Sequence, residues 1–464
     1  MFGYNKASTL LLKKFPPKRP LHSLSLHMPV DTATAGPRRD CDVLVIGGGP
    51  AGSTAASLLA QQGWRVVLLE KDRHPRFHIG ESLLPCNLPL FEWLGVKDEI
   101  ERIAVIKYGA QFVSNEHRKS ETFYFTEAVD KSLPYSYEVR RSEFDHILLK
   151  NCAARGAEVL EETKVSHVEF GAGRNPVVSA VNARGETRIW ESLFVIDASG
   201  RDTFLAGLLG IKERNPRHNS AALYAHFSGA ERLPGRDAGN ISIFWFEHGW
   251  FWMIPLKDGA MSVGAVCWPY YLKSRNTDVQ AFFMDTIALC PGVQARLRNA
   301  KMISPVTATG NYSYRAKCTA GEKFIMVGDA FAFIDPMFSS GVMLAMNSAF
   351  LGADVVHDCL TNSRLSRRWL RQYDRTVRHG LKMYSWFIYR VTRPAMRYMF
   401  MNPSNIFRAK EGLISLLAGD VFGRTPIFWK IFMFKLIYYA TSLKMWKESL
   451  AAYKAHKQRI KSAT

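Results

Sequence analysis

The apolar positions of this chain change period several times, and the order of these changes predicts the fold class. Val43 to Ile46 is a continuous apolar run, which is typical of a strand buried on both faces of a parallel sheet. Residues 53–62 are rich in Ala and Leu and predict a helix, and the apolar run from Arg65 to Glu70 predicts a second strand. Similar short runs at 194–197 and 324–327 predict further strands of the same sheet. This order predicts an α/β fold with a Rossmann-like nucleotide-binding domain.

A second pattern, rich in β-branched and aromatic residues, begins near residue 215. Its strand candidates are Ala222–Phe227, Ile241–Phe246, Trp250–Pro255 and Met261–Cys267, and residues 257–260 predict the hairpin turn between the last two. Residues 104–113 predict one continuous strand and residues 120–126 another. We therefore expect an antiparallel sheet, formed by about 104–135 and 215–320, as a substrate domain interleaved with the first domain.

The last part of the chain has a helical pattern. Residues 341–360 predict a long helix, and residues 364–464 predict a basic, aromatic helical C-terminal region. Its most apolar segment, 426–440, is interrupted by Lys430 and Lys435, so no uninterrupted run reaches the length of a membrane span. The predicted divisions are an extension over 1–40, the two interleaved domains over 41–363, and the C-terminal region over 364–464.

Charge is distributed unevenly along the 464 residues. The net charge is +20, of which residues 364–464 contribute +17, from 21 Lys and Arg against four Asp and Glu. Residues 1–40 contribute +5, and residues 41–363 are nearly neutral at −2. A basic end of this kind favours an acidic partner protein or peripheral contact with an anionic membrane. Nucleic acid is not expected as a partner, because the sequence contains no recognised nucleic-acid-binding module.

The first residues and the cysteines bear on localisation. An organellar targeting signal in residues 1–30 is one interpretation, and a disordered extension before an alternative start at Met28 is the other. The near absence of arginine before residue 38 favours the extension. The seven cysteines are scattered and include no C-x-x-C pair, which indicates a reducing compartment and neither disulfide framework nor metal site. We therefore expect a cytoplasmic protein.

Candidate chemistry begins with the glycines after the first strand. Gly47, Gly49 and Gly52 have G-x-G-x-x-G spacing, which permits a tight turn, a close approach to a diphosphate and close packing of helix on strand. The diphosphate would lie at the positive end of the helix. Glu70 ends the next strand and is placed to bind a ribose hydroxyl pair. The strand–glycine–helix–acid order predicts a dinucleotide site.

Other candidates lie further along the chain. The loop at 71–85 contains Arg76 and is well placed to contact the nucleotide, and Asp329 is placed to bind sugar-alcohol hydroxyls. Lys107 is one lysine within an apolar run, and a charged side chain is seldom fully buried without a partner. By itself it is therefore expected at an exposed edge of the sheet.

Several motifs together resemble those of the flavin-dependent halogenases, within the para-hydroxybenzoate-hydroxylase-like flavoproteins. Two of them are characteristic of halogenases: W-x-W-x-I-P at Trp250–Pro255 and F-x-x-P-x-x-S-x-G at Phe333–Gly341. The resemblance also includes Gly80–Pro85, Lys107, Asp197–Gly200 and Gly328-Asp329, and it covers about residues 40–360. In the C-terminal region only the helical character is similar.

The resemblance implies a cofactor and a set of site residues. The cofactor is FAD, used as FADH2, which with O2 oxidises chloride or bromide to hypohalous acid. The residues implied or expected to contact FAD are Gly47, Gly49, Gly52, Glu70, Arg76, Arg141, Asp329, Pro336, Gly341 and Val342. Halide is expected at Ser340, Gly341 and Val342. Lys107 is the expected catalytic lysine, which binds or traps the oxidant beside the substrate, while Trp250 and Trp252 separate flavin from substrate.

The resemblance also narrows the substrate. The pattern is most similar to members that act on phenols or pyrroles, free or bound to an acyl carrier protein. Tryptophan is not expected, because the glutamate that tryptophan-specific members place near Ser339 is missing. A separate flavin reductase is expected, because no second glycine fingerprint is present. The alternatives are an FAD monooxygenase, an isoprenoid-type reductase, and a membrane- or partner-binding flavoprotein without halogenating activity.

Overall fold

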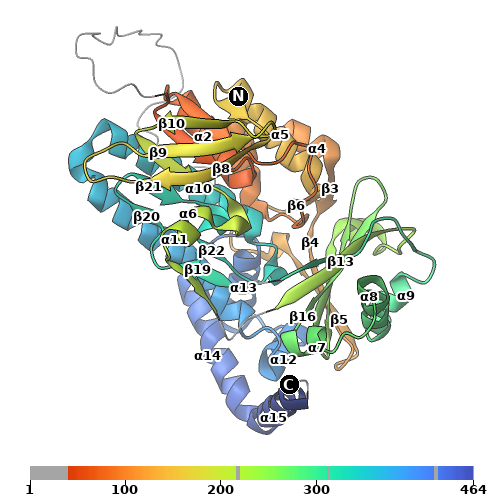
Figure 1. The fold of residues 1–464 in the computed structure, drawn as a ribbon. Coiled ribbons are helices and arrows are strands. Elements are labelled where there is room, and N and C mark those ends of the chain that lie inside the picture. Colours follow the sequence, from red (N-terminus) through yellow and green to blue (C-terminus); the bar gives the residue numbers. More distant parts are fainter. Residues whose placement is uncertain (1–39, 216–219, 311–312, 423–426, 463–464) are drawn as a thin grey trace, which may run out of the picture.

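A computed structural model describes residues 40–215, 220–310, 313–422 and 427–462 (Figure 1). The extension expected over 1–40 lies outside the described residues except for Asp40. All seven cysteines lie within the described ranges, and all are free thiols.

The first sheet is the one that the apolar runs predict. Six described strands form it in the order β20-β21-β11-β1-β2-β7. Its strands are β1 (Val43–Ile46), β2 (Val66–Leu69), β7 (Glu158–Leu160), β11 (Phe194–Asp197), β20 (Ala320–Gly321) and β21 (Phe324–Met326). All neighbouring strands are parallel except β20 and β21. The expected parallel sheet is confirmed.

Three helices pack with this sheet and with one another. They are α2 (Pro50–Gln61), α5 (Arg141–Ala154) and α10 (Gly341–Thr361), and α2 lies between the other two. The helix after the glycine motif thus begins at Pro50, because proline is favoured in the first turn of a helix. Further elements of this domain are α3 (Leu88–Leu94), α4 (Lys97–Ile103), α6 (Phe204–Leu208) and a three-stranded sheet of β8 (Thr163–Glu169), β9 (Val177–Asn182) and β10 (Thr187–Glu191).

The second sheet contains every strand candidate between 222 and 267. Its path is β17-β13-β16-β15-β14-β4-β5, with β18 paired to β13. The strands are β4 (Gly109–Ser114), β5 (Lys119–Tyr124), β13 (Ala221–Ser228), β14 (Ile241–Phe246), β15 (Gly249–Pro255), β16 (Met261–Cys267), β17 (Lys301–Met302) and β18 (Thr307–Thr309). One expectation is wrong: β14 and β4 pair in parallel, so the sheet is mixed and not antiparallel throughout. The helices α7 (Pro269–Lys273), α8 (Val279–Ala288) and α9 (Pro291–Arg296) follow β16.

The single strand expected over 104–113 is also wrong. The chain breaks at Tyr108 into β3 (Ala104–Lys107), which pairs with β6 (Ser136–Val139), and β4, which joins the second sheet. The side chain of Asn240 accepts from the backbone N–H groups of both Tyr108 and Gly109, which fixes the break. Lys107 therefore ends a strand between the two sheets. It is 1% exposed, so the expectation of an exposed edge position is wrong as well.

The C-terminal region is helical, as expected, and packs on both domains. Its helices are α11 (Ser366–Ile388), α12 (Pro394–Met401), α13 (Ala409–Leu417), α14 (Phe428–Lys444) and α15 (Trp446–Ser462). Tyr373 and Val377 of α11 join the core of the first domain. Phe400 of α12 packs edge-on against Phe112 and at a tilt against Phe123 of the second sheet, with ring centroids 4.8 and 5.3 Å apart. In Figure 1, α14 and α15 extend from the end of the molecule opposite the three-stranded sheet. Within the described ranges, every helix is too short or too polar to cross a bilayer.

Candidate active site

A cavity of about 710 Å³ opens where the first sheet, the second sheet and α10 meet. It brings together most of the residues that the sequence proposes for the site. Those that line it are Gly47, Gly49, Glu70, Arg76, Arg141, Trp250, Trp252, Asp329, Pro336, Gly341 and Val342. Gly52, Ser340 and Lys107 do not line it.

Glycine occupies the three positions of the motif for different structural reasons. A side chain at Gly47 would place its Cβ 2.5 Å from Ala198 O, and Gly47 has a φ of +101°, so both space and conformation require glycine. A Cβ at Gly52 would lie 1.8 Å from Gly47 O, so this glycine lets α2 approach β1 closely. At Gly49, by contrast, φ is −73° and the only atom near an added Cβ is Nη2 of Arg76 at 3.5 Å. The protein itself leaves this position open, toward the cavity.

Glu70 and Arg76 face the same part of the cavity. The Glu70 carboxylate accepts from the N–H of Gly48 at 2.6 Å and from the N–H of Asp72 at 2.9 Å, which fixes its orientation. A carboxylate has further lone pairs, so the two oxygens remain able to accept from a ribose. Nε of Arg76 is buried and has no hydrogen-bond acceptor within the described residues, although carboxylates lie 3.8 and 3.9 Å away. A diphosphate beside Gly49 would supply such an acceptor.

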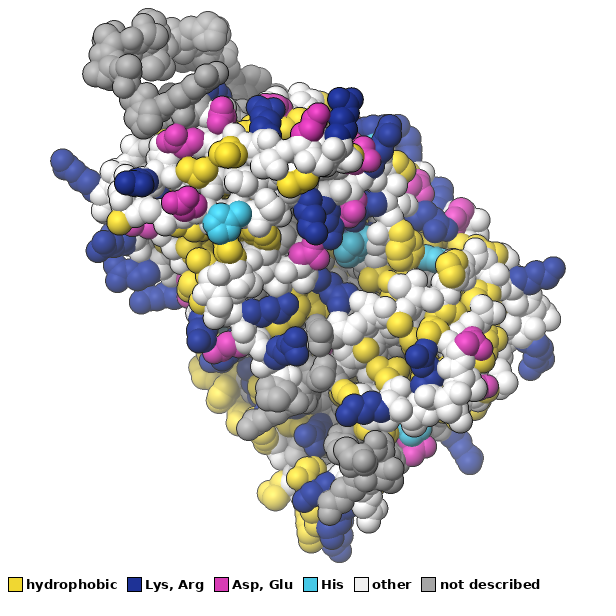
Figure 2. Space-filling model, in the orientation of Figure 1, with side chains coloured by type: hydrophobic (Ala, Val, Ile, Leu, Met, Phe, Trp, Pro, Cys, Tyr) yellow, Lys and Arg dark blue, Asp and Glu magenta, His cyan; other side chains and the backbone are white. Residues whose placement is uncertain are grey.

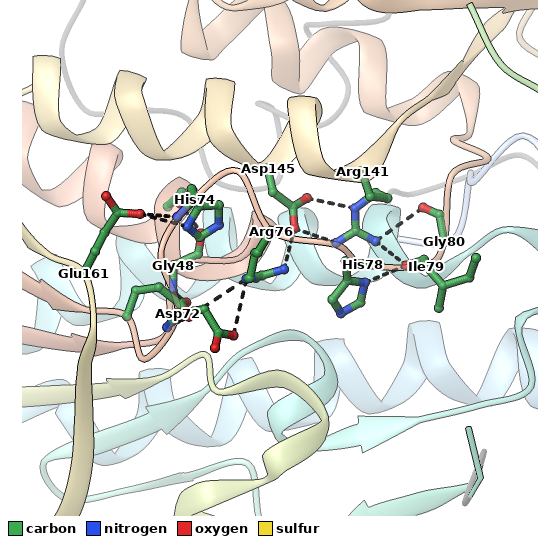
Figure 3. A network of polar contacts seen from close by, with 12 residues as sticks. Gly48, Asp72, His74, Arg76, His78, Ile79, Gly80, Arg141, Asp145 and Glu161 are labelled. Carbon is green, nitrogen blue, oxygen red and sulfur yellow. Dashed lines mark hydrogen bonds and ion pairs between the residues drawn. The ribbon is translucent and has the colours of Figure 1, made fainter. Parts of the chain in front are cut away.

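A buried carboxylate that the sequence did not identify holds the second arginine. Asp145 accepts from Nε of Arg141 at 2.8 Å and from Nη2 at 3.0 Å, and Nη1 of Arg76 lies 3.3 Å from the same carboxylate. Figure 3 shows the two guanidinium groups on either side of Asp145. Burial raises the pKa of Asp145, but the charge and hydrogen bonds of Arg141, together with the nearby charges of His78 and Arg76, outweigh it and hold the pKa below its usual value. The i, i+4 spacing on α5 was the available signal, but it does not reveal which way the pair faces.

Two aspartates follow the neighbouring strands β11 and β21. Asp197 is buried, and its carboxylate accepts from the N–H groups of Ser199 and Leu205, so it stabilises the loop after β11. Asp329 lies in the cavity wall. Burial raises the pKa of Asp329 to about 6, against which the charges of Arg201 and Arg141 act. Of these two aspartates, Asp329 lines the cavity and can accept hydrogen bonds from hydroxyl groups of a molecule there, whereas Asp197 does not line it.

The N-terminus of α10 forms a further part of the cavity wall. The first N–H groups of a helix have no acceptor within it, and Ser340 at the N-cap makes no side-chain cap. Gly341 and Val342 line the cavity there, whereas Ser340 is buried behind them. The preceding Ser339 has a left-handed backbone with φ of +55°, a strained conformation for a residue other than glycine. This conformation directs its hydroxyl toward Ser82, 3.0 Å away.

Trp250 and Trp252 form the wall on the side of the second sheet. Both are buried, and their ring centroids are 5.9 Å apart. The indole N–H of Trp252 donates to Ser262 Oγ at 3.2 Å. Its ring lies over Gly264 of the neighbouring strand, where an added Cβ would lie 2.2 Å from the ring. Gly264 therefore makes the space for Trp252, which the sequence pattern did not show.

Lys107 lines a separate, narrow chamber behind Ser339. The chamber measures about 10 Å³, room for about one water molecule. Its wall includes Phe125, Phe338 and Leu417, and it shares Ser339 and Ile241 with the large cavity. Nζ of Lys107 donates to Ser82 Oγ at 2.7 Å and to Leu83 O at 3.1 Å. The hydroxyls of Ser82 and Ser339 thus form a continuous polar path from Lys107 to the large cavity.

Glu138 completes the surroundings of Lys107, and the sequence did not identify it. Its Oε1 lies 3.8 Å from Nζ of Lys107 and accepts from Ser82 Oγ at 3.2 Å. Burial lowers the pKa of Lys107, an effect that Glu138 opposes. Burial likewise raises the pKa of Glu138 to about 8, although Lys107 acts in the other direction. Burial therefore moves the two pKa values toward each other, and only tertiary structure brings the pair together.

The described residues include no cluster of three or more His, Cys, Asp or Glu that fits a metal ion. The open position at Gly49, the Arg76 nitrogen without an acceptor and the free helix terminus instead fit a dinucleotide with a diphosphate, as FAD has.

Comparison with known proteins agrees with this assignment. A family model described as an FAD binding domain matches residues 40–378. The 1H-pyrrole-2-carbonyl-(peptidyl-carrier protein) chlorinase of Pseudomonas fluorescens is 30% identical over 408 residues, which cover 82% of this chain and 90% of that protein.

Two solved structures have the same fold. A flavoprotein/dehydrogenase from Cytophaga hutchinsonii has a TM-score of 0.80 and 27% identity, and the match covers 87% of this chain and 99% of that one. The myxobacterial chondrochloren halogenase CndH has a TM-score of 0.72 and 30% identity, and the match covers 88% and 97%.

The fold, the cavity and these matches define an FAD-binding flavoprotein. Within that class, the chain belongs to the flavin-dependent halogenases, enzymes that use FAD as FADH2. The halogenase relatives favour this assignment over the monooxygenase and isoprenoid-reductase alternatives.

Proposed function

We propose that this halogenase acts on an electron-rich aromatic ring, a phenol or a pyrrole, free or bound to a carrier protein, and that halogenation takes place at Lys107. The observation that carries the proposal is the position of Lys107. It is buried in an apolar chamber, and two serine hydroxyls join it to the cofactor cavity. The fold itself does not need an ammonium group at this position, because burying a charge without strong pairing costs free energy.

The residues around the large cavity would hold the cofactor and the halide. Gly47 and Gly49 with α2 would receive the diphosphate, Glu70 the ribose, and Asp329 the sugar-alcohol hydroxyls. When bound in reduced form, FAD supplies the oxygen-activating chemistry that oxidises halide. The N–H groups of Gly341 and Val342 would bind the halide, because the positive end of α10 favours an anion.

Lys107 would bind or trap the hypohalous acid and present it to the ring. Its lowered pKa supports this role, because the neutral amine is the nucleophilic form. Glu138 would accept or return the proton as the amine changes state, and Ser82 would orient both groups. Trp250 and Trp252 would keep the substrate away from the flavin, so that the ring is halogenated and not hydroxylated.

Two observations support a phenol or a pyrrole as the substrate: a glutamate is missing near Ser339, and one relative is named for its action on a pyrrole. Ser339 and Ser340 provide hydroxyls where tryptophan-specific members carry a glutamate nearby. One relative is named for its action on pyrrole-2-carbonyl bound to a peptidyl carrier protein. A phenol or pyrrole is activated enough by its own oxygen or nitrogen to react without a further carboxylate. The required FADH2 would come from a separate flavin reductase.

A direct assay tests the proposal. The protein is incubated with a flavin reductase, FAD, O2 and either chloride or bromide, and with a panel of phenols and a pyrrolyl carrier protein. Mass spectrometry should detect products in which one hydrogen is replaced by halogen. Products that gain oxygen in the same assay would instead support a monooxygenase. Flavin reoxidation without product on every substrate would contradict the proposed ring class.

A further inference from the structure

Helix α14 has two apolar faces, and the described part of the chain covers only one of them. Ile431, Phe434 and Tyr438 are buried against the helices of the C-terminal region. The exposed positions of α14 are nevertheless apolar as well, apart from Lys444. They are Phe428, Trp429, Phe432, Leu436, Tyr439, Ala440 and Leu443. A helix that is apolar on all sides is normally buried all round, so its outer face requires a partner.

The exposed side chains form one continuous stripe. Leu443 is 75% exposed, Trp429 68% and Phe428 66%. At 100° per residue these exposed positions fall within about a third of the helix circumference. Trp446, Leu450 and Tyr453 continue the pattern along α15, where no described residue is buried. Single exposed apolar residues are ordinary, but a stripe this long marks an interaction site.

A neighbouring loop adds to the stripe. Ile406 and Phe407 are 57% and 67% exposed, and their segment, residues 406–408, contacts α14. Phe407 and Arg408 both have left-handed backbones, with φ of +53° and +59°. This conformation is unfavourable for a bulky side chain such as phenylalanine. The backbone strain here holds an aromatic ring in an exposed position, which gives no benefit to a chain that stays in water.

Basic side chains border the stripe. Residues 427–462 contain eight Lys and Arg and a single acid, Glu448. Lys444 and Lys447 are exposed where α14 meets α15, and Lys454 and Lys457 are exposed along α15. Figure 2 shows hydrophobic and basic side chains together along the end of the molecule where α14 and α15 extend. Trp, Tyr and Lys beside aliphatic residues are typical of helices that lie in a membrane interface.

We propose that α14 and α15, with the loop at Ile406–Phe407, form a membrane-docking surface that lies in the interface of an anionic bilayer. The apolar stripe enters the boundary between headgroups and acyl chains, and the lysines contact anionic headgroups. A second copy of the chain is a poorer occupant, because a two-fold contact through this stripe would bring the lysine borders of both copies together. The proposal is independent of the substrate, since no residue of the stripe lines either cavity.

Vesicle co-sedimentation tests the proposal. The probes are vesicles of equal parts phosphatidylcholine and phosphatidylserine, and vesicles of phosphatidylcholine alone. The full chain should sediment with the anionic vesicles, and binding should weaken as salt rises, since screening shortens to about 10 Å at 0.1 M. The double variant Trp429→Gln, Leu443→Gln should bind these vesicles about tenfold more weakly or worse, because it removes two large apolar groups from the interface.

Matched variants distinguish binding through this surface from nonspecific adsorption to the vesicles. Ile189→Gln removes a side chain that is 59% exposed on β10, and it should bind vesicles as the unaltered chain does. Lys444→Glu with Lys447→Glu keeps the stripe and should lose the preference for anionic vesicles. All variants should retain FAD absorbance and halogenating activity. Failure of the full chain to bind anionic vesicles at low salt would overturn the proposal. So would a dimer, seen by light scattering, that the double variant converts to monomers.

Discussion

Lys107 has surroundings that constrain its chemistry closely. Its Nζ has two hydrogen-bond acceptors and one carboxylate 3.8 Å away, within an otherwise apolar chamber. If Lys107 served only the fold, removing it would leave Glu138 without its cationic partner, and stability, bound flavin and product would fall together. If Lys107 carries an oxidant, its removal should abolish the product while the flavin stays bound, so substitution distinguishes the two roles.

We predict that Lys107→Ala retains bound FAD and O2 consumption but lowers halogenated product by about a hundredfold or more. Lys107→Arg should be nearly as inactive, because a guanidinium group does not provide a neutral amine. Product mass and O2 uptake are measured side by side for the three proteins. Normal halogenation by Lys107→Ala would remove the proposed role, and a joint loss of flavin and product would indicate a structural role.

Glu138 predicts a pH dependence of stability. Its pKa is raised from 4.5 to about 8 in the folded protein, so between these values the folded state binds more protons than the unfolded state. The free energy of unfolding therefore falls as pH rises through this range, by up to about 1.4 kcal/mol per pH unit. Glu138→Gln removes this contribution.

Urea unfolding of both proteins from pH 5 to pH 8 measures the effect. Relative to the unaltered protein, Glu138→Gln should become progressively more stable as pH rises. If the two stability curves run parallel, the carboxyl group is not titrating in this range. Activity offers a second readout, because Lys107 without its neighbouring carboxylate should titrate at a lower pH.

At the scale of elements, the turn from β1 to α2 separates binding from folding. Gly49→Val should leave the thermal midpoint of the flavin-free protein nearly unchanged, because its φ is ordinary and the space beside it is open. It should nevertheless abolish FAD binding, since the side chain occupies the place of the diphosphate. Gly52→Ala provides the contrast: its Cβ would meet Gly47 O at 1.8 Å, so the protein should lose stability and flavin together. Flavin absorbance measures FAD binding by both variants, and thermal melts measure their stability.

Most elements were predictable from local pattern, and the errors have physical causes. Val43–Ile46 and Trp250–Pro255 are apolar runs whose length and flanking turns fix their structure. The break at Tyr108 was not predictable, because it depends on an amide from Asn240, 132 residues away. The parallel pairing of β14 with β4 is likewise a choice of partner that no local pattern encodes.

For the site as well, features encoded by local sequence were predictable and features that depend on distant contacts were not. Glycine spacing identified the cofactor side, because a turn bound to a diphosphate has a local sequence requirement. Glu138, Asp145 and Gly264 were missed, since each matters through a contact made across strands or helices. The burial of Lys107 was missed for the same reason.

At the scale of the molecule, the C-terminal helices divide into a structural part and a peripheral part. Truncation after Met445 removes α15, none of whose described residues is buried, and should leave the thermal midpoint and halogenation nearly unchanged. Truncation after Phe422 also removes Ile431, Phe434 and Tyr438 from the second core, at a cost of about 1.5–3 kcal/mol each. That protein should unfold at a much lower temperature or aggregate. Thermal melts and product yields are measured for both truncated proteins. If the two proteins behave alike, the C-terminal helices do not divide into a structural and a peripheral part.

The small volume of the chamber at Lys107 also has a consequence for how the substrate enters. No aromatic ring fits into about 10 Å³, so the ring is admitted only while Phe338, Leu417 and their neighbours stand apart. The apparent affinity for substrate is then reduced by the fraction of molecules that are open at any moment. Association should accordingly level off at high substrate concentration, at the rate of opening. Leu417 belongs to α13, and no residue of α13 lines the flavin cavity, so a movement of this helix would admit substrate without disturbing the cofactor site.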